Sequence, residues 1–97
     1  MTETASANIL RLNGPVTMSN ATGIRRQGLD CIGRGGAVVD WAAVTEVDSS
    51  AVSLLLEWLR AARQGGRTVH FIHLPENLTS LARLYGVLAL LPPAADI

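Results

Sequence analysis

Asp48, Ser49 and Ser50 form a short polar group between two apolar runs of the sequence. Side chains of these types accept hydrogen bonds from the unpaired backbone N–H groups at the start of a helix. A single cap, from Asp48 or Ser49, satisfies that need. The other hydroxyl is then free to face a partner, at a helix end that carries a partial positive charge. The triplet therefore predicts a helix start with surplus hydroxyl groups at the surface.

The other residues that could carry chemistry do not assemble into a catalytic or metal site. His70 and His73 stand three residues apart on an expected strand, so their side chains point to opposite faces and do not share a metal ion. Cys31 lies in an apolar part of an expected helix and is interpreted as a small buried residue. The glycine cluster at 33–36 precedes a strand and is interpreted as a turn. We expect no enzyme activity, no cofactor and no metal.

Composition narrows the classes of protein further. The 97 residues hold eight arginines, no lysine and eight acidic residues, for a formal net charge of zero. A P-loop needs a lysine, and non-specific nucleic-acid binding needs an excess of positive charge, so neither is expected. The one cysteine fits a reducing compartment. No signal peptide and no membrane-spanning run is recognised, which predicts a cytoplasmic protein without direct membrane insertion.

The order of expected elements is β-β-α-β-α-β-α. Two short strands at 9–12 and 16–18 flank a turn at Asn13-Gly14, and a helix follows over 19–36. An apolar strand at Ala37–Trp41 leads to the triplet and to a helix from Ser50 to Gln64, which Gly65-Gly66 ends. A strand at 68–74 and a final helix over 78–85, capped by Asn77 and ended by Gly86, complete the chain. This order predicts one α/β domain over 8–97 with a small mixed sheet of about four to five strands, after a flexible tail at 1–7.

Trp41 and Trp58 have two interpretations. Core burial is the expected role for both, since large aromatic side chains are mostly buried. The helix around Trp58 is apolar over more than one face, however, so Trp58 is also a candidate anchor for a partner protein. Arg60 and Arg63 would then lie at the polar rim of that contact.

Two segments resemble a known family, the STAS domains. Val47-Asp48-Ser49-Ser50 with Leu54-Leu55-Leu56 behind it resembles the strand-to-helix junction of that family, and the element order matches over about residues 8 to 91. Leu81-Ala82-Arg83-Leu84-Tyr85, followed by a short apolar tail, is similar to the C-terminal helix of the MlaB-like branch. Members of this branch are subunits of the Mla phospholipid transporters. The resemblance implies an α/β STAS fold.

The resemblance also implies a function. It predicts a non-catalytic STAS subunit of a phospholipid ABC transporter that maintains outer-membrane lipid asymmetry. Such a subunit binds and regulates the ATPase subunit at the inner face of the inner membrane. The residues that we expect at the partner contact are Asp48, Ser49, Ser50, Ser53, Trp58 and Arg60.

A second function from the same family stays open. Ser50 aligns with the serine that is phosphorylated in anti-sigma-factor antagonists, which implies a kinase as the alternative partner. The sequence departs from both branches at Ala51, where glycine is usual. It also carries Asp48-Ser49-Ser50 where the Mla branch commonly has Asp-Thr-Gly, so only the first hydroxyl is kept, as Ser49.

Overall fold

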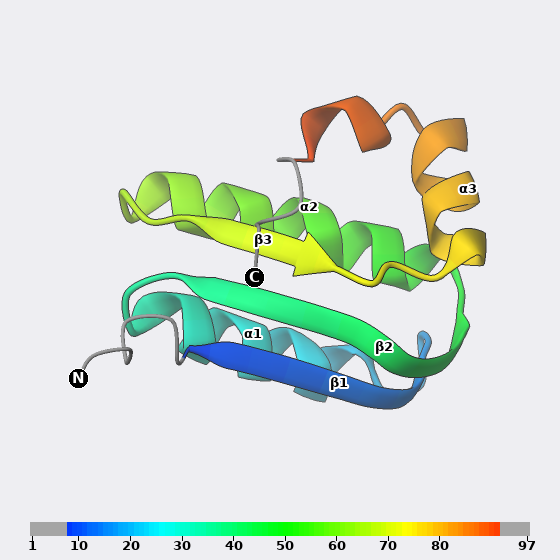
Figure 1. Ribbon diagram of the computed structural model, residues 1–97, viewed down its shortest axis with the longest axis horizontal. Coiled ribbons are helices and arrows are strands. Elements are labelled where there is room, and N and C mark those ends of the chain that lie inside the picture. Colours follow the sequence, from blue (N-terminus) through cyan, green and yellow to red (C-terminus); the bar gives the residue numbers. More distant parts are fainter. Residues whose placement is uncertain (1–7, 92–97) are drawn as a thin grey trace.

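A computed structural model describes residues 8–91 as a three-stranded sheet with helices packed against it (Figure 1). All strand pairs are parallel, in the order β1-β2-β3, which confirms the predicted α/β class. In chain order the elements are β1 (Ile9–Val16), α1 (Ala21–Gly33), β2 (Ala37–Val47), α2 (Ser49–Gln64), β3 (Val69–Ile72), α3 (Glu76–Leu84) and the 3-10 helix η2 (Leu88–Leu90).

The first strand differs from the prediction. The expected turn at Asn13-Gly14 is absent, and residues on both sides of it form the single strand β1. Gly14 does adopt a positive φ of 72°, but the chain does not reverse there. Instead, the register of β1 with β2 shifts between Gly14 and Pro15. Pairing with β2 continues on both sides of Gly14, from Ile9 to Val16, so the glycine lies at an irregularity of the ladder and not in a hairpin turn. The described sheet therefore has three parallel strands rather than a mixed set of four or five.

The core lies between one face of the sheet and the two long helices, α1 and α2 (Figure 1). Along β2, Ala37, Val39 and Trp41 are buried on this face, while Val38 and Asp40 point the other way. α2 contributes six buried residues, including Leu55 and Trp58. Burying each large apolar side chain stabilises the fold by about 1.5–3 kcal/mol, so this layer holds the domain together. Among the helices of residues 8–91, none combines the length and the hydropathy of a membrane-spanning segment.

Glycines end two helices as predicted. Gly66 follows α2 with a φ of 67°, and Gly86 follows α3 with a φ of 72°. The N–H of Val87 bonds the carbonyl of Ala82 at 2.8 Å, which satisfies an otherwise unpaired carbonyl at the end of α3. The start of α3 was predicted wrongly, because Pro75 rather than Asn77 occupies the capping position. The fixed φ of proline suits the residue that joins an extended segment to a helix.

Candidate functional site

The carboxyl ends of the three parallel strands meet at one edge of the sheet, where α2 begins (Figure 1). Asp48 separates β2 from α2, so the predicted polar triplet lies at this edge. The structure confirms the helix predicted over 50–64 and starts it one residue earlier, at Ser49. Asp48 is therefore the cap, and both serines belong to the first turn of the helix.

Asp48 connects two segments that are distant in the sequence. One carboxylate oxygen accepts a hydrogen bond from the N–H of Ser50 at 2.9 Å and another from the Ser50 hydroxyl. The second oxygen accepts from the N–H of Met18 at 3.0 Å. Met18 lies in the turn between β1 and α1. The carboxylate thus caps α2 and fastens this turn to it.

The turn at residues 17–20 is itself well braced. The Asn20 side chain accepts from the N–H of Thr17 at 2.9 Å and donates to the carbonyl of Pro15 at 2.7 Å. Asn20 precedes α1, but its side chain makes no helix-cap hydrogen bond, because these turn contacts use it. The braced turn presents Met18, which is 78% exposed, beside the start of α2. Met18 was not recognised from the sequence, where it is the last residue of the strand expected at 16–18, whereas β1 ends at Val16.

The hydrogen bonds from Ser50 and Met18 lower the pKa of Asp48 from its ordinary value of 3.8. A carboxyl whose pKa is lower in the folded state stabilises the fold above its unfolded pKa, and this contribution is lost as the pH falls through the folded value. We expect the Asp48→Asn variant to lose less stability than the wild type between pH 5 and pH 3. Urea unfolding at each pH measures the difference.

Asn keeps one oxygen for Ser50 but turns an N–H group toward Met18, so this variant also loosens the turn at neutral pH. The matched control is Asp30→Asn, since Asp30 is an exposed carboxyl of α1 that no hydrogen bond or ion pair reaches within residues 8–91. If wild type and Asp48→Asn show the same acid dependence, the Asp48 contacts do not favour the charged form of its carboxyl in the folded state.

The exposed members of the predicted set form one stripe along α2. Ser49, Ser53 and Arg60 are all exposed. They are spaced by four and then seven residues, close to one and two turns at about 3.6 residues per turn, so they share a face over about 16 Å. Ser50 is half-buried and its hydroxyl is bound to Asp48. The surplus hydroxyl at the surface is therefore that of Ser49.

Trp58 does not belong to this stripe. Its side chain is fully buried, and its indole N–H donates to the carbonyl of Arg25 in α1 at 3.2 Å. The ring stacks on Phe71 and packs at an angle against Trp41, with centroids 6.3 Å apart in both pairs. The core interpretation is confirmed for both tryptophans, and we therefore leave Trp58 out of the docking surface. The wide apolar face of α2 packs against the sheet and α1, so Trp58, the one aromatic residue of α2, is inaccessible to a partner.

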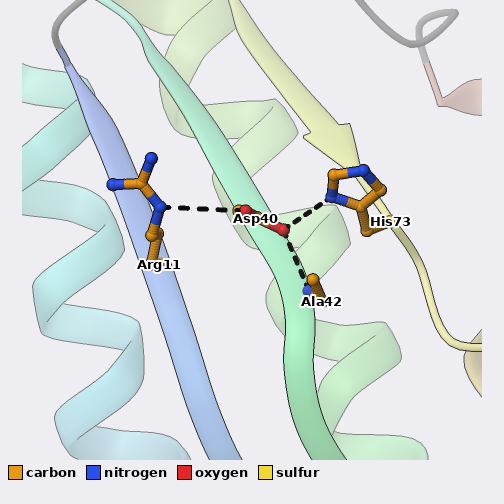
Figure 2. A network of polar contacts seen from close by, with 4 residues as sticks. All are labelled: Arg11, Asp40, Ala42 and His73. Carbon is orange, nitrogen blue, oxygen red and sulfur yellow. Dashed lines mark hydrogen bonds and ion pairs between the residues drawn. The ribbon is translucent and has the colours of Figure 1, made fainter.

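A second polar cluster joins β1, β2 and the residue that follows β3, on the sheet face opposite α1 and α2 (Figure 2). His73 Nδ1 lies 2.9 Å from Asp40 Oδ1, which also accepts from the N–H of Ala42 at 2.9 Å. Arg11 Nε lies 3.9 Å from the other oxygen. These contacts, led by the hydrogen bond from His73, lower the pKa of Asp40. This cluster was not recognised from the sequence, although Asp40 is the one charged residue of the apolar strand expected at Ala37–Trp41.

We interpret the Asp40 cluster as a structural contact and not as a reactive site. His73 has a φ of 57°, and its bond to Asp40 holds the connection from β3 to α3 in that conformation. Cys31, the remaining candidate, is buried at the end of α1 as predicted, with its thiol 3.0 Å from the Asn8 side-chain oxygen. Within residues 8–91 no three histidine, cysteine or acidic side chains are grouped as a metal site would require.

Comparisons with known proteins give a consistent result. The family model described as "Mlab, STAS domain" matches residues 1–92. A search of curated proteins found no match. Among solved structures, the unphosphorylated anti-sigma factor antagonist SpoIIAA matches with a TM-score of 0.70 and 16% identity, covering 91% of this chain and 79% of that one.

Two further structures are similar. The phosphorylated form of SpoIIAA, a Bacillus cell fate determinant, has a TM-score of 0.66 and 16% identity over 91% of this chain and 82% of that one. A structure described as Mglu has a TM-score of 0.58 and 25% identity over 70% of this chain, but only 17% of that one. At such identities these matches establish the shared fold alone. The predicted STAS fold is thereby confirmed.

Proposed function

The chain belongs to the Mlab STAS-domain family, and on that basis we propose that it is the STAS subunit of a phospholipid-transporting ABC complex of the Mla type. In this role it catalyses no reaction. It binds the ATPase subunit at the inner face of the inner membrane, and it stabilises and regulates that subunit.

The exposed stripe of Ser49, Ser53 and Arg60, beside the Asp48 cap, is the observation that carries the proposal. Two hydroxyls and one guanidinium on a helix face provide directional hydrogen bonds without a large charge. Exposed Met18 adds an apolar contact next to them. Because Asp48 fastens the Met18 turn to α2, this surface is rigid before the partner arrives. Little conformational freedom is then lost on binding.

A pair of substitutions at Ser49 tests the docking surface. We expect Ser49→Glu to weaken binding of the ATPase subunit at least tenfold, which corresponds to about 1.4 kcal/mol. The larger, charged side chain would separate the surfaces and repel acceptors. Ser49→Ala removes only the hydroxyl and should cause a smaller loss. Both variants should unfold within about 0.5 kcal/mol of the wild type, because Ser49 is exposed. Co-purification and biolayer interferometry with the ATPase subunit measure the effect.

The matched control is Ser80, an exposed serine of α3, changed to Glu and to Ala. These variants should bind like the wild type. Unchanged affinity and ATPase rate in Ser49→Glu would place the docking surface elsewhere on the domain. A domain that binds no ATPase subunit of its own transporter operon at all would contradict the proposed function itself.

The alternative function is an anti-sigma-factor antagonist switched at Ser50, which the structural similarity to both forms of SpoIIAA supports. A phosphate on Ser50 would add almost two negative charges directly beside Asp48. It would also remove the hydroxyl hydrogen bond to Asp48 and so disturb the cap and the Met18 turn.

The intact mass after co-expression with a candidate kinase separates the two functions. The alternative requires the mass of one phosphate on the wild type and none on Ser50→Ala. A neighbouring permease and ATPase gene pair favours the transporter, and a neighbouring kinase and sigma factor favours the switch.

A further inference from the structure

A cavity of about 270 Å³ lies at the C-terminal end of α2, beyond the two serines of the exposed stripe and next to its Arg60 end. Its lining residues come from the last turns of α2, from β3 and the two residues before it, and from η2. The lining residues are Leu59, Ala62, Arg63, Arg67, Thr68, Val69, His70 and Leu90. The cavity therefore combines an apolar wall with basic side chains, and nothing in the proposed docking role uses it.

The positive charge at this cavity is not neutralised by the described part of the chain. Arg11 and Arg25 each have a carboxylate partner, Asp40 and Glu57 respectively. Arg63 and Arg67 are exposed and make no ion pair within residues 8–91. Of the residues between 8 and 91 that line the cavity, none carries a carboxylate. Two guanidinium groups four residues apart, on the rim of one cavity, favour an anion that accepts from both.

The carbonyl groups at the end of α2 are bonded by backbone N–H groups and not by the guanidinium groups of Arg63 and Arg67. The backbone N–H of Arg67 bonds the carbonyl of Ala62 at 2.8 Å, and the N–H of Gly66 bonds that of Arg63 at 3.2 Å. Backbone groups thus satisfy two of the free carbonyls at this helix end. The guanidinium of Arg67 lies over the helix end, with Nη1 3.7 Å from where a side chain on Gly65 would begin. Its donors remain available to a ligand.

The apolar wall narrows the ligand class. Leu59, Ala62 and Val69 continue the core to the cavity, and Leu90 stays 60% exposed at its mouth. The volume is slightly below the range of about 300–1,000 Å³ that is typical of ligand pockets, so it suits a small head group with a few methylenes rather than a two-chain lipid. We propose that this cavity binds a single-chain anionic amphiphile, whose phosphate or carboxylate contacts Arg63 and Arg67 while its chain lies along Leu59 and Leu90.

Isothermal titration of the full chain with dodecyl phosphate, below its micellar concentration, tests the proposal. We expect saturable one-to-one binding at least tenfold tighter than that of inorganic phosphate. Dodecanoate should also bind, since carboxylate and phosphate share the recognised charge, and uncharged dodecanol should bind at least tenfold more weakly. The assay needs no ATPase subunit, so its outcome is independent of the proposed docking role.

The double variant Arg63→Gln, Arg67→Gln should lose at least tenfold in affinity for dodecyl phosphate. The matched control is Arg26→Gln, Arg34→Gln, which removes two exposed arginines that do not line the cavity and should bind like the wild type. Leu90→Asn should weaken the binding of dodecyl phosphate and leave the binding of inorganic phosphate unchanged. Absence of saturable binding, equal loss in both double variants, or phosphate binding as tight as dodecyl phosphate would each overturn the proposal.

Discussion

Gly28→Ala is expected to lower the free energy of unfolding by about 2–3 kcal/mol, although alanine favours a helix by up to about 1 kcal/mol over glycine. Gly28 is buried where α1 packs on α2. A side chain there would begin 2.1 Å from Cε2 of Trp58. The indole cannot move aside, because it is fully buried and bonded to Arg25. The helices must therefore separate, and core contacts are lost.

Urea unfolding, followed by tryptophan fluorescence, measures this loss, and the melting temperature should fall by roughly 10–20 °C. Gly23→Ala is the matched control in the same helix. Nothing lies within 4 Å of a side chain placed at Gly23, so this variant should be more stable than the wild type by roughly 0.5–1 kcal/mol. Combining Gly28→Ala with Trp58→Phe should cost less than the two changes summed. A stabilised Gly28→Ala variant would mean that the two helices do not pack at this position.

Trp58→Ala should lower the free energy of unfolding by about 3–5 kcal/mol, as expected for a large aromatic side chain removed from a core. A domain of this size is stable by only about 5–15 kcal/mol, so the variant retains little stability. The change removes the stacking on Phe71, the packing against Trp41 and the hydrogen bond to Arg25. The urea midpoint of the isolated domain measures the cost.

Arg60→Ala is the informative comparison, because Arg60 lies on the same helix but on its exposed face. It should change stability by no more than about 0.5 kcal/mol and should weaken partner binding instead. If Trp58→Ala kept the wild-type urea midpoint and lost only partner binding, the side chain would be an interface anchor and its burial in the core would be refuted.

Some positions were readable from the sequence because local rules govern them. Asp48 caps α2, and Gly66 and Gly86 follow helices with positive φ, where a cap and a left-handed residue depend only on a few neighbours. Local rules failed where a local preference competed with pairing to a distant segment. Asn13-Gly14 is a strong turn signal, yet pairing with β2 extends the strand through it. Hydrogen bonds along a whole strand outweigh one turn preference.

The internal glycines of α1 show the same division. Both Gly23 and Gly28 have a low intrinsic helix propensity, and only the tertiary structure shows that their surroundings differ. Gly23 lies in open space, while Gly28 is required by the close approach of Trp58. A sequence shows that a residue lacks a side chain, but not which neighbour occupies the space.

The sequence by itself determined the α/β class, the helix that begins at the polar triplet and the family resemblance, because hydrophobic period, caps and short motifs are local properties. The tertiary structure decided which side chains are available. It placed Trp58 in the core, engaged Ser50 with Asp48, left Ser49 exposed and brought Met18 beside it. It also brought Arg63, Arg67 and Leu90 around one cavity. Exposure and proximity depend on how distant segments pack, and no local pattern encodes that packing.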